Sequence, residues 1–328
     1  MKLMNHSRRH CLLGGVAAAL LPWRADAQDA AYPSRPLRFV VGFAPGGPAD
    51  GVTRLFASRL QAQLGQTVNV ENVPGAGSTL GIARLSKMAA DGYTIGFAHT
   101  ASLSIGPSLY KNVGYDPLKS LTSVARLCEY VNVLAVRADS QWRSLSDLLA
   151  AARAQPGALS YGSAGIGSTN HLSGELLAAK AGVKLTHVPY RGTALAVNDL
   201  MGGALQFVFD APNSAGPLAA AGKIRLLATT GRTRHKLYPD LPSIAETVPD
   251  YEFRGWMGVV APSGLPPALQ QRLTRELELA SAAPDTAERL AALGLDVAFG
   301  EPHELARVIA AELALWGPLI RSLNLTVQ

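Results

Sequence analysis

Two glycine-rich segments, residues 43–50 (FAPGGPAD) and 162–171 (GSAGIGSTNH), carry the residue types best suited to binding a small molecule. Each is expected between a β-strand and the helix that follows it. Glycine lets the backbone approach a ligand closely, and the free N–H groups at a helix start attract anions. The second segment adds hydroxyl groups, which suit a carboxylate without an arginine clamp. The two segments therefore predict a site for a small anion.

Both segments also have a purely structural interpretation. Asp50 could cap the helix after the first segment, and Ser168 or Thr169 could cap the helix after the second. The first segment is not a phosphate loop, because no Gly-Lys-Ser/Thr follows it. A third segment, residues 74–81 (PGAGSTLG), resembles a dinucleotide fingerprint. Its glycine spacing is one residue too long, so a turn followed by a helix start is favoured.

Spacings that enzymes need are missing from the sequence. It contains no G-x-S-x-G motif, and its histidines show no H-x-x-x-H spacing for a metal. Asp210, at the end of an apolar strand, is expected in the ligand cleft without a partner for acid–base catalysis. His99-Thr100, at the end of another strand, either lines the cleft or is structural. The sequence predicts a binding protein with no catalytic residue, metal or cofactor.

The first 27 residues have the layout of a secretory signal peptide. Three basic residues precede an apolar stretch at 11–21, and Ala25-Asp26-Ala27 matches the small-x-small pattern before a cleavage point. The stretch is too short to span a bilayer. Arg8-Arg9 also fits a twin-arginine signal, so the choice between the two export routes stays open. Export to the periplasm is expected.

The charge of the chain depends strongly on this segment. Cleavage after Ala27 removes four Lys/Arg residues and one acid, which lowers the formal net charge from +6 to about +3. No Lys/Arg run of the kind that binds nucleic acid remains, so no nucleic-acid partner is expected. Cys128 is then the only cysteine left, and a buried hydrophobic role is favoured over a nucleophile.

Short apolar runs alternate with helical patterns, which predicts parallel βαβ units in two tandem sets. Strands are expected at 37–43, 67–70, 93–98, 132–136, 159–162, 185–188, 206–209, 224–228 and 256–260. Helices are expected at 49–64, 79–90, 145–154, 169–181 and 194–201, followed by two C-terminal helices without strands of their own.

Those C-terminal helices are expected to pack back on the first βαβ set. This makes the second set an insertion, with chain crossings and a hinge near residues 124–130 and 253–256. The expected domains are 32–126 with 256–328, and 127–255. The two glycine-rich segments occupy equivalent places in the two domains, at the carboxyl ends of strands, where open α/β sheets bind ligands.

Motifs in a fixed order along almost the whole chain beyond residue 27 resemble the tripartite tricarboxylate transporter substrate-binding family, also called the Bug proteins. Residues 32–37 resemble the start of that family, and residues 43–50 resemble its first ligand loop. Two positions depart from the family pattern: this chain has Ser78 where the family often has glycine, and Leu195 where the family often has proline. The other segments are VENVPGAGSTLG (70–81), ADGYTIGFAHT (90–100), YDPLKSLTSVA (115–125), YGSAGIGSTNHLSGELL (161–177), VPYRGTALAVNDLMGG (188–203) and PDLPSIAETVPDYE (239–252).

The resemblance implies a type II-like periplasmic binding protein fold. Two α/β domains, each a mixed, mostly parallel sheet flanked by helices, would close on the ligand like a Venus flytrap. The implied ligand is a small carboxylate (an amino acid, an aromatic acid, or a di- or tricarboxylate) held by backbone amides, hydroxyls and water. Carried over to this chain, the ligand-binding residues are Ala44, Gly46, Gly47, Asp50, Thr100, Ser163, Ala164, Gly165, Ser168, Thr169 and Asp210.

The resemblance also implies a partner. A monomer in the periplasm would deliver the carboxylate to the membrane permease subunits of a tripartite tricarboxylate transporter. A second role stays open, in which the liganded protein presents itself to the outer domain of a two-component sensor kinase.

Overall fold

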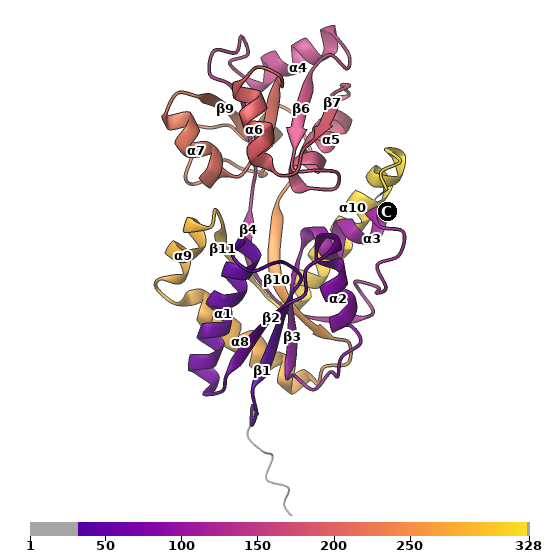
Figure 1. Ribbon diagram of the computed structural model, residues 1–328, viewed down its shortest axis with the longest axis vertical. Helices are drawn as coiled ribbons and strands as arrows, with labels where there is room; N and C mark the ends of the chain where they lie inside the picture. Colours follow the sequence, from indigo (N-terminus) through magenta and orange to yellow (C-terminus); the bar gives the residue numbers. More distant parts are fainter. Residues whose placement is uncertain (1–31, 327–328) are drawn as a thin grey trace, which may run out of the picture. The chain divides into compact units, whose positions relative to one another are not determined.

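The computed structural model describes residues 32–326, whose strands form two separate sheets (Figure 1). The expected signal peptide lies outside the described residues. One sheet has six strands in the order β11-β4-β10-β3-β1-β2, and we call it, with the helices that pack on it, lobe I. Its strands are β1 (Leu37–Val41), β2 (Val68–Asn72), β3 (Thr94–His99), β4 (Leu121–Tyr130), β10 (Gly255–Pro262) and β11 (Asp296–Gly300).

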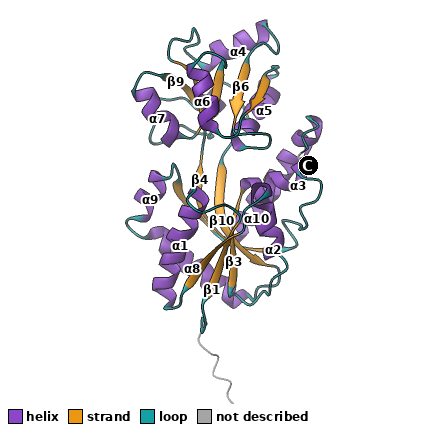
Figure 2. Cartoon of the chain, in the orientation of Figure 1, coloured by secondary structure: helices purple, strands orange, loops and turns teal. Residues whose placement is uncertain are grey.

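The other sheet has five strands in the order β7-β6-β8-β5-β9 and forms lobe II with its helices. Its strands are β5 (Val133–Arg137), β6 (Ser160–Ser163), β7 (Thr186–Pro189), β8 (Phe207–Asp210) and β9 (Ile224–Thr229). Helices flank both sheets (Figure 2). Those of lobe I are α1 (Pro48–Leu64), α2 (Thr79–Leu85), α3 (Gly106–Leu109), α8 (Pro267–Ala282), α9 (Thr286–Ala292) and α10 (Pro302–Ser322). Those of lobe II are α4 (Leu145–Ala154), α5 (Thr169–Ala181), α6 (Thr193–Met201) and α7 (Pro212–Ala220).

Most strands of each sheet run in one direction. In lobe I, β10 and β11 run against the other four strands. In lobe II, β5 alone runs against the rest of the described sheet. The predicted fold class, two α/β domains with mixed and mostly parallel sheets, is therefore confirmed.

The structure contains five helices and strands that were not expected from the sequence: β4, β11, α3, α7 and α9. The expectation that the C-terminal helices have no strand of their own is wrong, because β11 precedes α10 and pairs with β4. β4 gives no alternating pattern because register shifts interrupt its pairing with β10. It continues in lobe I as far as Tyr130, so the expected boundary at residues 126/127 falls inside a strand.

Local sequence explains why α1 begins and ends where it does. Pro48 occupies the first helical position, where its missing N–H costs nothing. Gly65 ends the helix in the left-handed conformation, with φ 67°. Between them, Val52, Phe56 and Leu60 repeat every four residues and are fully buried. This apolar stripe holds α1 on the lobe and so fixes the position of its N-terminal turn.

The hydrophobic core of lobe II includes residues from lobe I elements. Ile105 and Leu109, next to and in α3, share this core with Phe209 of β8. Trp316 and Ile320, in the last turns of α10, belong to it as well. The C-terminal helix therefore contributes to both lobes, because Leu305 near its start lies in a separate core of lobe I.

A substitution at Gly96 of β3 tests how tightly α2 packs on that strand. A Cβ atom there would lie 2.2 Å from Cδ2 of the fully buried Leu85. We expect Gly96→Ala to lower the free energy of unfolding by about 1–3 kcal/mol, because the overpacked core must shift. Urea unfolding followed by circular dichroism measures this. The matched control is Gly202→Ala, whose Cβ would have its nearest neighbour at 3.4 Å and which should change little. Equal stabilities of the two variants would contradict the close packing of α2.

Candidate ligand-binding site

Loop one, residues 43–50, joins β1 to α1 and is held in shape by Asp50. The Asp50 carboxylate accepts hydrogen bonds from Gly46 N–H (3.0 Å), Arg54 Nε (2.8 Å) and Asn72 Nδ2 (2.9 Å). The same Asn72 amide donates to the carbonyl of Phe43 at 2.9 Å. Burial opposes ionisation of Asp50, but these three donors outweigh it and lower its pKa to about 2. Asp50 therefore fixes the loop from within.

The structure does not support the interpretation of Asp50 as the cap of α1. The residue that caps α1 is Gly47, and no side chain caps the helix. Both carboxylate oxygens already have protein partners, and the residue is only 3% exposed. Asp50 reaches back from the first helical turn to Gly46 N–H, as the acidic residue of a capping box does. We assign it to positioning loop one.

The first turn of α1 leaves backbone donors free. Gly51 N–H makes the first bond within the helix, to the carbonyl of Gly47. In the described part of the chain, the N–H groups of Gly47, Ala49 and Asp50 have no hydrogen-bond partner. Unpaired N–H groups at a helix start favour an anionic ligand.

Loop two, residues 162–171, joins β6 to α5 and is held by its own side chains. Ser163 Oγ accepts from Gly165 N–H at 3.0 Å. Ser168 caps α5, as one interpretation of the sequence proposed, and accepts from His171 N–H at 3.3 Å. Among residues 32–326, no partner exists for the N–H groups of Thr169 and Asn170 in the first turn of α5. Loop two thus repeats the arrangement of loop one.

Gly167 links loop two to lobe I. Its φ of 78° is a conformation that favours glycine, and a Cβ there would lie 2.1 Å from Cδ2 of Leu109. Leu109 belongs to α3 and is buried in the core of lobe II. The loop therefore requires glycine for its path and for its contact with α3.

Thr100 lies directly after β3, but its hydroxyl is already used. Its Oγ1 accepts from the backbone N–H of Trp256 at 2.9 Å, and the residue is fully buried. Trp256 belongs to β10, which brings the chain back from lobe II. Neighbouring His99 bonds to Ser102 Oγ at 2.9 Å, and burial lowers its pKa to about 4. Both residues hold the end of β3 in place.

Asp210 ends β8, and the structure leaves one of its oxygens without a partner. Oδ2 makes no hydrogen bond within residues 32–326, although the residue is only 3% exposed. Burial raises the pKa of Asp210, and hydrogen bonds from Ser214 and Ala211 oppose this only in part. A buried carboxylate oxygen without a partner is costly. Among the acids of residues 32–326, Asp210 alone has a buried oxygen without a hydrogen-bond partner.

Within each lobe, the structure brings the predicted residues to one edge of the sheet. In lobe I, parallel β1 and β3 lie side by side, so Ala44, Gly46 and Gly47 lie near Thr100, and the Phe43 and His99 rings are 5.0 Å apart. In lobe II, parallel β6 and β8 place loop two beside Asp210. The Asn170 side-chain amide donates to the carbonyl of Phe209 at 2.8 Å, which ties the start of α5 to β8.

The size of the surface cavities does not point to the two glycine-rich loops. A groove of about 990 Å³ lies elsewhere on lobe I, between α8 and the start of α10, and includes Leu118, Gln270 and His303. None of the predicted site residues lines it. The backbone donors of the two loops are a more specific signal than the volume of this groove.

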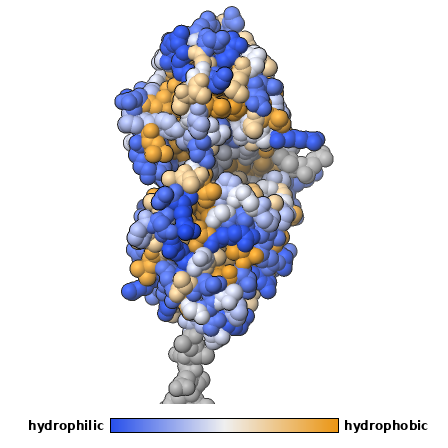
Figure 3. All heavy atoms as spheres, turned by 60° about the vertical axis from the view of Figure 1, so that its left-hand side comes forward, coloured by the Kyte–Doolittle hydropathy of each residue, from blue (hydrophilic) through white to orange (hydrophobic). Residues whose placement is uncertain are grey.

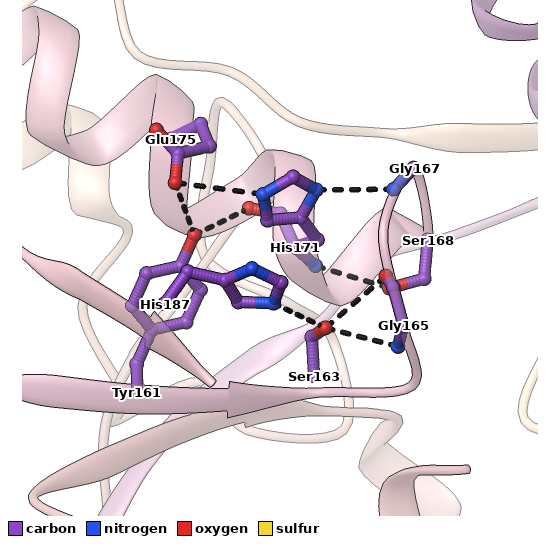
Figure 4. A network of polar contacts seen from close by, with 8 residues as sticks. All are labelled: Tyr161, Ser163, Gly165, Gly167, Ser168, His171, Glu175 and His187. Atoms are coloured by element: carbon purple, nitrogen blue, oxygen red, sulfur yellow. Dashed lines mark hydrogen bonds and ion pairs between the residues drawn. The ribbon is translucent and has the colours of Figure 1, made fainter. Parts of the chain in front are cut away.

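Several residues that shape the two loops were missed on the sequence. Asn72 is the last residue of β2. The other candidates were found at the carboxyl ends of strands, and the same rule could have identified Asn72. Beneath loop two, the side chains of Tyr161, His171, Glu175 and His187 form a polar network (Figure 4). Three different elements supply these four residues, so no spacing in the sequence could reveal the network.

No group of His, Cys, Asp and Glu residues in the described chain has the arrangement of a metal site. Cys128 is buried, as expected, and burial raises the pKa of its thiol. Among residues 32–326, none of the helices is both long and apolar enough to cross a membrane. On the face shown in Figure 3, hydrophobic side chains form separate small patches among hydrophilic ones.

Asp50→Asn tests the anchoring of loop one. We expect the free energy of unfolding at pH 7 to fall by about 1–2 kcal/mol, because the ion pair with Arg54 is lost. The pKa of Asp50 lies below its ordinary value of 3.8, so its stabilisation is complete above about pH 4 and disappears as the pH falls toward 2. Urea unfolding at several pH values should show less acid dependence in the variant. Exposed Asp240→Asn is the control, and identical acid profiles for Asp50→Asn and the wild type would refute the assignment.

Comparison with known proteins identifies relatives along nearly the whole chain. Residues 52–325 match the tripartite tricarboxylate transporter family receptor. A UPF0065 protein in the tcbD-tcbE intergenic region of Pseudomonas sp. strain P51 is 39% identical over 97% of this chain and 95% of its own. Protein BugT of Bordetella pertussis is 32% identical over 97% of this chain and 98% of its own.

Solved structures agree with these relatives. The periplasmic binding protein BugD matches with a TM-score of 0.72 and 33% identity, over 90% of this chain and 100% of its own. Rpa4515 of R. palustris, solved with adipate, matches with a TM-score of 0.75 and 32% identity, over 90% of this chain and 100% of its own. MatC of Rhodopseudomonas palustris, solved with bound malate, matches with a TM-score of 0.71 and 30% identity, over 88% of this chain and 100% of its own. The chain therefore belongs to the tripartite tricarboxylate transporter receptor (Bug) family of periplasmic solute-binding proteins, and it is a binding protein and not an enzyme.

Proposed function

We propose that this protein captures a small carboxylate between loop one and loop two and delivers it to a membrane transporter of the tripartite tricarboxylate type. The observation that carries the proposal is the pair of helix starts, one in each lobe, at which several backbone N–H groups have no partner within residues 32–326. Each start would contribute about 0.3–1 kcal/mol through the helix dipole, and hydrogen bonds to the charged ligand would add to this. The proposed ligand-binding residues are Ala44, Gly46, Gly47, Ser163, Ala164, Gly165, Ser168 and Thr169 of the two loops, with Thr100 and Asp210 beside them and Asp50 holding loop one in shape.

The ligand class rests on the relatives and on the apolar side chains beside the loops. Adipate and malate are the ligands of two related structures. In this chain, Ile166 of loop two is 47% exposed, Leu195 at the start of α6 is 50% exposed and Leu80 at the start of α2 is 55% exposed. Exposed aliphatic side chains next to anion-binding loops suit the carbon chain of a dicarboxylate.

Asp210 has a separate role in this proposal. An unpaired carboxylate oxygen repels a ligand carboxylate, so it would accept a hydrogen bond from a bridging water or from a hydroxyl or amine of the ligand. Its neighbour across the parallel pair β6–β8 is loop two, which binds the carboxylate. Asp210 therefore distinguishes the polar end of a substituted acid from the carboxylate end.

Closure and delivery complete the proposed cycle. The chain leaves lobe I after Tyr130 and enters β5 at Val133, and it returns to β10 at Gly255. We place the hinge in these two connections. The ligand stabilises the closed form because only that form brings both loops to it, and the closed form is the one presented to the transporter. Export through the predicted signal peptide at residues 1–27 places the protein where this delivery occurs.

A panel of carboxylates tests the ligand class. We expect malate, adipate, citrate or benzoate to raise the melting temperature, because a ligand that binds only the folded protein stabilises it. Adipamide is the matched neutral control and should have no effect, since it lacks the charge that the helix starts attract. Differential scanning fluorimetry identifies binders, and calorimetric titration gives their affinities. No shift with any of the acids, or an equal shift with adipamide, would refute the proposal.

Gly47 allows the removal of a single backbone donor. Its φ of −85° and ψ of 172° suit proline, and a Cβ there would meet nothing within 4 Å. We expect Gly47→Pro to weaken binding of the best acid in the panel about tenfold, because one N–H bond to a charged group is lost. Gly47→Ala keeps the N–H group and should bind like the wild type. Equal affinities for both variants, measured by calorimetric titration, would exclude Gly47 from the site.

A further inference from the structure

The polar network beneath loop two is built around two stacked histidines. His171 of α5 and His187 of β7 have ring centroids 3.9 Å apart, with the ring planes inclined by 27° (Figure 4). His187 Nε2 lies 2.6 Å from Ser163 Oγ, and the same hydroxyl accepts from Gly165 N–H. His171 Nδ1 accepts from Gly167 N–H at 3.1 Å. The path of loop two therefore depends on both imidazoles.

The hydrogen bonds fix the protonation state of His171. Because Nδ1 accepts from Gly167 N–H, it carries no proton, and the ring proton sits on Nε2. That nitrogen faces Glu175 Oε1 at 3.5 Å. Glu175 Oε1 also accepts from the Tyr161 hydroxyl at 2.8 Å. A proton added at Nδ1 would point at the N–H group of Gly167, so a charged His171 cannot keep this contact with loop two.

The surroundings offer little compensation for a second charge. The titratable groups that face the pair are Glu175 on α5, Tyr161 on β6 and Tyr251 before β10, whose hydroxyl donates to Ser173 O at 3.1 Å. Glu175 is the one carboxylate among these and already accepts from Tyr161. In the described chain, no Lys or Arg pairs with Glu175. A charge on His187 would lie directly against the ring of His171.

We propose that His171 and His187 are positioning residues for ligand binding, and that loop two keeps its binding form only while both imidazoles are neutral. The proposal rests on the proposed function, because loop two must bind the ligand for its shape to affect affinity. Neither histidine touches the ligand in this account. They act through Gly165, Gly167 and Ser163, whose positions set the direction of the free N–H groups in loop two.

The direction of the pH effect follows from His187. Burial, followed by repulsion from His171, lowers its pKa to about 4, and Glu175 opposes this only in part. An exposed histidine has a pKa of 6.5. The ordered loop is therefore fully favoured above about pH 6.5 and loses its advantage as the pH falls toward 4. At pH 5.5, one unit below the ordinary value, the advantage has fallen about tenfold.

The test compares ligand affinity at pH 7.5 and pH 5.5 for the wild type and four variants, with malate and adipate as probes. For the wild type, we expect affinity to fall up to about tenfold more than for His187→Gln. His171→Asn keeps an acceptor for Gly167 N–H, so it should bind like the wild type at pH 7.5 with a flatter pH profile. His171→Leu removes that acceptor and should bind more weakly at both pH values. Exposed His303→Gln is the control and should retain the wild-type profile.

Protonation of malate or adipate affects the wild type and all variants equally, so it cancels when their pH profiles are compared. Any titration of His99 in lobe I cancels for the same reason. Equal pH profiles for the wild type, His187→Gln and His171→Asn would overturn the proposal. So would wild-type affinity in His171→Leu.

A measurement without ligand separates this proposal from the proposed function. Nitrogen-15 NMR of the wild type should show His171 protonated at Nε2 at pH 7.5. The amide signals of Gly165 and Gly167 should shift on acidification to pH 5.5 and stay in place in His187→Gln. If malate and adipate do not bind but these signals behave as stated, the ligand class fails and the loop mechanism stands. If the acids bind while the glycine signals ignore pH, or His171 carries its proton at Nδ1, the loop mechanism fails.

Discussion

The structure depends on keeping a few backbone N–H groups unpaired while everything around them is fixed. Nearly all buried backbone donors in a folded protein are paired, so free donors occur mainly at helix starts. Two such starts, at α1 and α5, lie in the two glycine-rich loops. A backbone donor has no rotamers, and its direction is set only by the path of the loop that carries it. The directions of the free N–H groups are therefore fixed only as well as the side chains beneath the loops hold those loops in place.

The two lobes anchor their loops with different chemistry. In lobe I an ionised carboxylate, Asp50, gathers Gly46, Arg54 and Asn72. In lobe II neutral groups do the same work, since Ser163, Ser168 and His171 accept hydrogen bonds from N–H groups of residues 165, 171 and 167, respectively. The carboxylate anchor keeps its charge down to about pH 2, because the pKa of Asp50 is lowered. The neighbouring His187 in lobe II is held neutral by burial, which lowers its pKa to about 4. The lobes are alike in architecture but differ in their sensitivity to acid.

Sheet topology explains why loops distant in sequence can act together within a lobe. Parallel strands end at the same edge, so β1 and β3, and likewise β6 and β8, carry their following loops to one place. The bond from Trp256 N–H to Thr100 then ties the edge in lobe I to the strand that returns from lobe II. A site built in this way needs no cationic side chain, which agrees with the modest charge of the chain beyond residue 27.

The sequence by itself determined the fold class, the strand–helix alternation, both glycine-rich loops and the family. These depend on local patterns: apolar periodicity, Pro48 at a helix start, and motifs in a fixed order. It did not reveal β4 and β11, because bulges and an edge position remove the alternation that marks a strand. Nor could it assign Asp50, Thr100 or the histidine pair, whose partners lie 22, 156 and 16 residues away. Only the tertiary structure decides which polar groups are already satisfied, because a hydrogen bond depends on positions in space that residue types alone do not fix.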